Sequence, residues 1–116
     1  MHDEKIERFD PEVLRQLTSG DQEIMTVVVS AFLSQYPEHL ENLRNACLSG
    51  NSSQVLFAAH SLKGMATQLG AANLRKIATG IEKLAKEGAS PSTLLSLTDA
   101  LSQEFAELSK LLARLH

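Results

Sequence analysis

Residues 55–70 read VLFAAHSLKGMATQLG. Five apolar side chains in this stretch are spaced by four, three, four and three residues: Val55, Ala59, Leu62, Ala66 and Leu69. At ~100° per residue they fall on one stripe of a helix, which predicts a helix packed against others on that side. His60 lies away from the stripe, on the side of Lys63 and Thr67. We therefore expect its imidazole to face solvent while the helix is anchored from behind.

Gly64 lies one turn after His60, inside the expected helix. Glycine in a helix interior costs about 1 kcal/mol relative to alanine, so the missing side chain needs a reason. One interpretation is that a partner molecule requires close access to the imidazole. The other is that a neighbouring helix approaches closely at this position.

Apolar residues with the same period predict a short helix and one long helix before this stretch, and two long helices after it. The expected residues at the helix starts are Asp10-Pro11, Asp21 and Ser90-Pro91, with Ser52 or Ser53 capping the helix that carries His60. Pro37 removes one backbone donor and should kink or split the second helix. The sequence therefore predicts an all-α fold: an antiparallel up-down-up-down four-helix bundle with a short extra N-terminal helix.

The composition fits one domain over residues 1–116. Hydrophobic residues make up 43% of the chain and aromatic residues only 4%, which favours aliphatic helix packing over a sheet sandwich. The charged stretch from Met1 to Arg8 is expected to be a disordered tail. A single cysteine, Cys47, excludes an internal disulfide.

Charge and hydropathy exclude several classes of partner. The net charge is −3 with acids and bases interspersed, so there is no polybasic signal for nucleic acid. No apolar run approaches the ~20 residues of a membrane span and the start lacks a secretory signal, so we expect no membrane partner and a cytoplasmic location. His2, His39 and His116 form no ligand spacing with His60, so no metal site is expected.

The motif around the histidine resembles that of the histidine-containing phosphotransfer (HPt) family, which runs His-x-Leu-Lys-Gly and continues to a glycine ten residues after the histidine. The matching positions here are His60, Leu62, Lys63, Gly64 and Gly70. The resemblance spans nearly the whole chain. It implies that His60 accepts a phosphoryl group from an aspartate of one response-regulator receiver domain and passes it to another.

The same resemblance implies the partners: receiver domains and a hybrid sensor kinase, acting on a monomer. It implies no ATP-dependent kinase activity and no cofactor of the chain's own, since Mg²⁺ would belong to the aspartate site of the partner. A non-phosphorylated helical adaptor that binds signalling proteins is the alternative function. A hydrolase would be a third function, but the sequence contains no set of nucleophile, base and acid that supports it.

Imidazole suits phosphoryl relay because it offers a neutral nitrogen nucleophile at cellular pH. We expect Nε2 of His60 to attack and Nδ1 to find a partner. The resemblance points to a polar residue twenty-two positions later, here Glu82, where the family often has an amide. The alternative for Glu82 is a solvated pair with Lys86, four residues on. Lys63 would offset charge on the phosphoryl oxygens, or would simply be a solubilising lysine.

The expected docking residues lie around the histidine. Leu56 and Phe57 flank it on the outward face, where two large apolar side chains indicate a partner surface. Packing of the short N-terminal helix on Phe57 is the alternative. Thr67 and Gln68 would contact phosphate or partner, or would be solvated polar residues.

Overall fold

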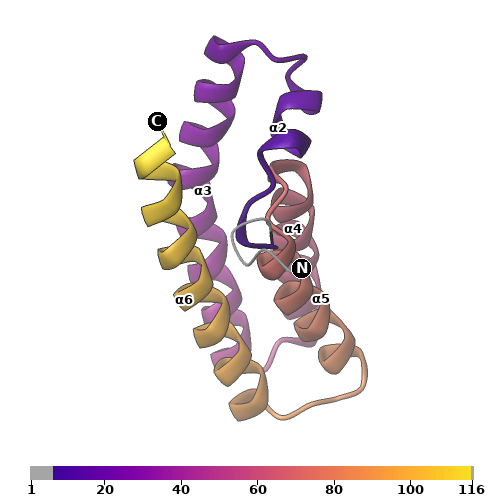
Figure 1. The fold of residues 1–116 in the computed structure, drawn as a ribbon. Helices are drawn as coiled ribbons and strands as arrows, with labels where there is room; N and C mark the ends of the chain where they lie inside the picture. Colours follow the sequence, from indigo (N-terminus) through magenta and orange to yellow (C-terminus); the bar gives the residue numbers. More distant parts are fainter. Residues whose placement is uncertain (1–6, 116) are drawn as a thin grey trace.

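The computed structural model describes residues 7–115, and the regular elements in them are helices (Figure 1). A short helix precedes four long ones: α2 (Pro11–Leu17), α3 (Gln22–Ser49), α4 (Ser52–Leu69), α5 (Ala72–Lys86) and α6 (Pro91–Leu115). The long helices run alternately in opposite directions and short connections join them (Figure 1). The predicted antiparallel bundle with an extra N-terminal helix is confirmed.

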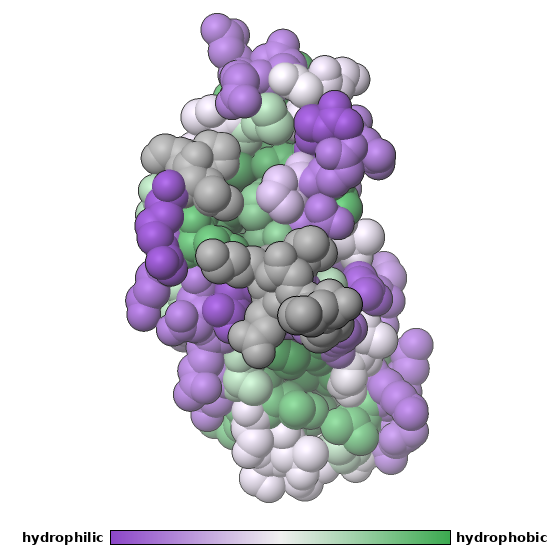
Figure 2. Space-filling model, viewed as in Figure 1, coloured by the Kyte–Doolittle hydropathy of each residue, from purple (hydrophilic) through white to green (hydrophobic). Residues whose placement is uncertain are grey.

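The core of the bundle is built from aliphatic stripes and one aromatic cluster. The five predicted stripe residues of α4 are all at most 2% exposed. The rings of Phe32, Tyr36 and Phe105 join α3 to α6, with centroids 4.8–5.7 Å apart. Figure 2 shows the result on one face: apolar residues gather along the middle of the molecule and polar residues line its edges. This is the distribution that amphipathic helices produce.

One expectation about helix boundaries needs correction, and one of two alternatives left open for Pro37 is excluded. The cap of α4 is Asn51, whose side chain accepts a hydrogen bond from the Gln54 amide at 3.1 Å, rather than Ser52 or Ser53. Pro37 lies inside one continuous helix, so it does not split α3. Tyr36 and Leu40 on either side of it are both buried in the same core. That packing on both sides outweighs the loss of one backbone hydrogen bond.

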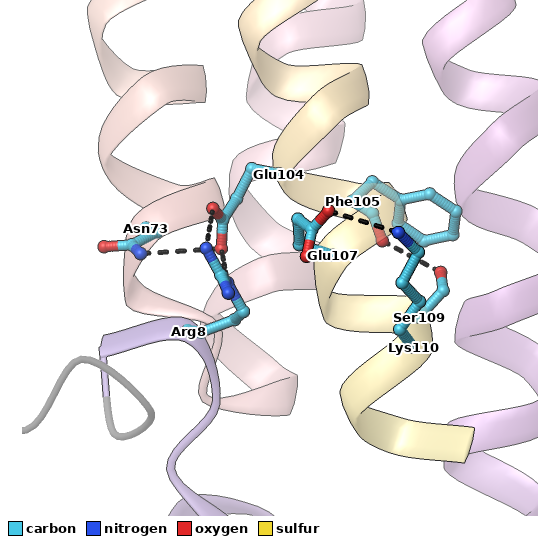
Figure 3. Close-up of polar contacts among 7 residues, drawn as sticks. All are labelled: Arg8, Asn73, Glu104, Phe105, Glu107, Ser109 and Lys110. Carbon is cyan, nitrogen blue, oxygen red and sulfur yellow. Dashed lines mark hydrogen bonds and ion pairs between the residues drawn. The ribbon is translucent and has the colours of Figure 1, made fainter. Parts of the chain in front are cut away.

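The segment before α2 is tied to the bundle. Arg8 donates two hydrogen bonds to the carboxylate of Glu104 on α6, at 3.0 and 3.3 Å, and Asn73 of α5 approaches the same carboxylate at 3.5 Å (Figure 3). Phe9 is buried, and Lys76 pairs with Glu7 at 3.4 Å. The predicted tail therefore does not extend to Arg8. Its first six residues lie outside the described part of the chain.

Gly70 fixes the N-terminal segment against the turn between α4 and α5. Its carbonyl accepts a hydrogen bond from the Asp10 amide at 2.9 Å, and its φ of +87° lies in the left-handed region. A Cβ at this position would lie 2.7 Å from the Asp10 carbonyl oxygen and 2.9 Å from Cβ of Val13. The position therefore requires glycine both for its backbone conformation and for space.

We predict that Gly70→Ala destabilises the bundle more than Gly50→Ala does. Gly50 also has a positive φ, +69°, but a Cβ there would meet no atom within 4 Å. Gly50→Ala should therefore cost only the conformational penalty, about 1 kcal/mol. Gly70→Ala should cost about 1–3 kcal/mol more, because the neighbouring backbone must move. Urea unfolding of both variants measures the difference, and equal losses would contradict the required close approach.

Candidate functional site

His60 is presented to solvent by a firmly anchored helix. Its side chain is 69% exposed, whereas Ala59 and Leu62 on the opposite side of α4 are fully buried. Because the buried stripe leaves α4 little freedom to rotate, the histidine has a fixed outward position. The prediction of a solvent-facing imidazole is confirmed.

Glu82 of α5 connects His60 to Lys63. One oxygen of its carboxylate, Oε2, lies 3.1 Å from Nδ1 of His60, and the other, Oε1, accepts a hydrogen bond from Nζ of Lys63 at 2.8 Å. The Glu82 side chain is only 14% exposed and that of Lys63 29%. The predicted contact between Glu82 and Nδ1 is present. Among the described residues no ion pair joins Glu82 to Lys86.

The surroundings of Glu82 keep it ionised. The hydrogen bond from Lys63 is the main cause that lowers the pKa of the Glu82 carboxyl below its ordinary value, with the His60 contact and the nearby charge of Lys86 acting in the same direction. Partial burial opposes them without reversing the shift. An ionised carboxylate only accepts hydrogen bonds, so Nδ1 of His60 must carry the proton at this contact. In the neutral ring the lone pair of Nε2 is then free for a nucleophilic attack.

Gly64 leaves open space beside the histidine. A Cβ at this position would meet no atom within 4 Å. Close approach of a neighbouring helix of the bundle is therefore not the reason for the glycine. Clearance for a molecule that reaches His60 from outside stays a prediction.

The two predicted apolar docking residues differ in exposure. Phe57 is 75% exposed and is not covered by α2, so the alternative of packing by the N-terminal helix is not observed. Leu56 is half-buried and packs against the core, which makes it partly structural. A shallow depression beside Phe57 is lined from α3 by His39, Asn42 and Asn45. These α3 residues carry no local sequence signal, because only the packing of the two helices brings them to the site.

Thr67 and Gln68 lie on the exposed side of α4, in different surroundings. The Thr67 hydroxyl donates to the Lys63 carbonyl at 2.9 Å, a local helical contact. Gln68 borders an apolar groove between α3 and α4 that includes Val27, Val28 and Met65. Contacts of Thr67 and Gln68 with phosphate or a partner stay predictions.

Two further features bear on the class of site. Within residues 7–115, no group of three or more His, Cys, Asp or Glu side chains is placed to hold a metal ion. In the same part of the chain, none of the helices has the length and apolar character needed to cross a membrane.

Comparisons with known proteins agree on one family. The family model of the Hpt domain matches residues 27–116. The crystal structure of histidine-containing phosphotransfer protein B (HptB) from Pseudomonas aeruginosa PAO1 is similar with a TM-score of 0.85 at 25% identity, covering 92% of each chain. The Hpt domain of a sensor hybrid histidine kinase from Shewanella has the same fold, with a TM-score of 0.71 at 16% identity over 94% of this chain and 97% of that one. No curated protein sequence gives a match.

The lowered pKa of Glu82 predicts a pH-dependent contribution to stability. A carboxyl whose pKa is lower in the folded state stabilises the fold above its unfolded pKa, and this contribution is lost as the pH falls through the folded value. At pH 7 the free energy of unfolding of the wild type should exceed that of Glu82→Gln by about 1 kcal/mol. The difference should shrink as the pH falls below the ordinary value of 4.5.

Urea unfolding between pH 7 and pH 3 measures this difference. Glu38→Gln is the matched control, because Glu38 is exposed on α3 and has no ion pair among the described residues. A wild-type advantage over Glu82→Gln that is the same at both ends of the pH range would contradict the role of the ionised carboxylate in holding the site.

Proposed function

Because this chain belongs to the Hpt domain family and is a phosphorelay phosphotransfer protein, we propose that His60 is the residue that carries the phosphoryl group. The observation that supports this most is the contact between Nδ1 of His60 and the ionised Glu82 carboxylate. It orients the ring, holds the proton on Nδ1 and leaves Nε2 exposed as the nucleophile. A helical adaptor without phosphorylation would have no need of this arrangement.

The transfer step requires only His60, Glu82 and the aspartyl phosphate of a receiver domain. The Nε2 lone pair of His60 attacks the phosphorus of an aspartyl phosphate on a receiver domain, an N–P bond forms, and the P–O bond to the aspartate breaks. The aspartate leaves as a carboxylate, and the positive charge gained by the ring is offset by Glu82. Donation to a second receiver domain is the reverse reaction. Lys63 lies one turn from His60, where its ammonium offsets charge on the phosphoryl oxygens.

Hpt domains are phosphocarriers that work with receiver domains and hybrid kinases. For this chain we infer that Phe57 anchors the receiver domain, because it is the large apolar side chain left exposed beside His60. Gly64 gives the incoming aspartate room. The chain would act as a cytoplasmic monomer without kinase activity or a cofactor of its own, and any Mg²⁺ would be held by the receiver domain.

Replacement of the proposed phosphoacceptor should separate chemistry from folding. His60→Gln should abolish acceptance of label from a radiolabelled phospho-receiver domain and leave helical circular dichroism unchanged, because removal of an exposed side chain opens no cavity. His39→Gln is the control, a histidine on α3 that lines the depression beside Phe57 but has no proposed part in the transfer. The wild-type label should be acid-labile and base-stable. Labelling of His60→Gln at the wild-type rate would rule out the assignment.

Phe57 and Lys63 should affect different steps. Phe57→Ala should weaken receiver binding by about 1–2 kcal/mol, the usual range for an interface anchor, with the rate in the saturated complex nearly unchanged. Lys63→Ala should lower the saturated rate more than the affinity, because its charge matters most during transfer. Single-turnover transfer at increasing receiver concentration separates the two effects. If both variants changed the affinity and the saturated rate in the same way, the separate roles of Phe57 in binding and Lys63 in transfer would be contradicted.

A further inference from the structure

Charge is unevenly distributed along the chain. The segment from Ser52 to Lys86, which forms α4 and α5, has five basic residues and one acidic residue. Its net charge is therefore +4, although the whole chain has a net charge of −3. The acidic exception is Glu82, which is already engaged by His60 and Lys63.

Three of these basic residues form a strip on α5, which we call the α5 strip: Arg75, Lys83 and Lys86. All three are exposed, and none has an ion-pair partner among the described residues. Arg75 and Lys86 share the face of α5 that carries Glu82, at spacings of seven and four residues, and Lys83 borders this face. The other two basic residues of the segment, Lys63 and Lys76, are paired with Glu82 and Glu7.

Two residues of the α5 strip adjoin the proposed phosphoryl site, whereas Arg75 lines a separate depression that includes Glu7 and Asp10. Lys83 and Lys86 line a shallow depression that also includes Glu82 and Thr79, with Glu87 as the other carboxylate at its edge. Because Glu82 contacts both His60 and Lys63, this depression begins where the site ends. Phe57 lies on the other side of His60, next to α3. The histidine is therefore bordered by an apolar surface on one side and a basic surface on the other.

We propose that the α5 strip attracts and docks an acidic surface of the receiver domain, so that the partner covers His60 from both sides. This inference rests on the proposed function. An aspartate site that receives a phosphoryl group and holds Mg²⁺ needs several carboxylate oxygens, because Mg²⁺ prefers oxygen ligands. The phosphorylated aspartate adds further negative charge. The cations of the α5 strip thus face a partner surface of opposite sign, which raises the rate of association.

The size of the strip favours a protein over other acidic partners. Anionic membranes are recognised by clusters of about 4–8 basic residues, and nucleic acid binding draws on many phosphate contacts. Three cations on one helix are too few for either, and carboxylates border them: Glu82 and Glu87 beside the lysines, Glu7 and Asp10 beside Arg75. They match the charged rim of a protein interface, which sets association rates more than it sets final affinity.

The test compares two double variants with the same change in charge. Lys83→Gln/Lys86→Gln removes two cations from the last turns of α5, and Lys110→Gln/Arg114→Gln removes two from the last turns of α6. The C-terminal ends of α5 and α6 lie at opposite ends of the bundle (Figure 1). Single-turnover transfer from a phospho-receiver domain is measured against receiver concentration, at low salt and at ~1 M salt, where charges are screened within about 3 Å.

We expect the α5 variant to lower the second-order rate constant of transfer about tenfold at low salt. The loss should nearly disappear at high salt, with the saturated rate unchanged, and the α6 variant should resemble wild type. Equal losses in both variants would overturn the proposal, because net charge alone would then be the cause. A fall in the saturated rate at unchanged affinity would overturn it too, since the lysines would then act in the transfer itself.

The remaining outcomes separate this inference from the proposed function. If all proteins accept label on His60 and the α5 variant keeps the wild-type dependence on receiver concentration and salt, only the docking role fails. If wild type accepts no label from the phospho-receiver domain, the proposed function fails and the docking role fails with it. Thermal unfolding of both double variants shows whether the loss of a cation near a helix C-terminus has altered the fold.

Discussion

The candidate phosphoryl site depends on one carboxylate that serves two donors. Glu82 approaches the His60 ring and the Lys63 ammonium at the same time, one with each oxygen. This requires α4 and α5 to lie at one fixed rotation and one fixed register. A shift of either helix by one residue would turn its side chain by about 100° and break both contacts. The buried apolar stripes of α4 and α5 fix this rotation and register, and they thereby hold His60 in place.

The register of the two helices is set at their connection. Gly70 ends α4 in the left-handed conformation and accepts the backbone hydrogen bond from Asp10. The N-terminal segment then crosses to α6, where Arg8 binds Glu104 beside Asn73 of α5. The glycine of the family motif thus acts about three turns away from the histidine. It fixes the end of the helix pair, and the candidate site lies in the middle of that pair.

Local sequence signals were sufficient for much of this structure. The apolar period predicted the bundle, and the positions of His60 and Gly64 on α4 followed from the same period. Signals failed where two elements compete or meet. Asn51 caps α4 in place of its serine neighbours. Arg8 is held by the carboxylate of Glu104, ninety-six residues away. Whether Glu82 would face His60 or Lys86 was undecided from sequence, because an isolated α5 suits the pair with Lys86 and only the packing of α4 on α5 brings His60 within reach.

The separation along the chain of the paired residues has a consequence for the order of folding. His60 and Glu82 are twenty-two residues apart, whereas Arg8 and Glu104 are ninety-six apart. Contacts of short sequence separation form at a lower entropic cost and therefore earlier. The helical hairpin that holds the candidate site thus depends on contacts of short sequence separation. We expect closure of the bundle by its first and last segments to follow, so that the site forms before the fold is complete.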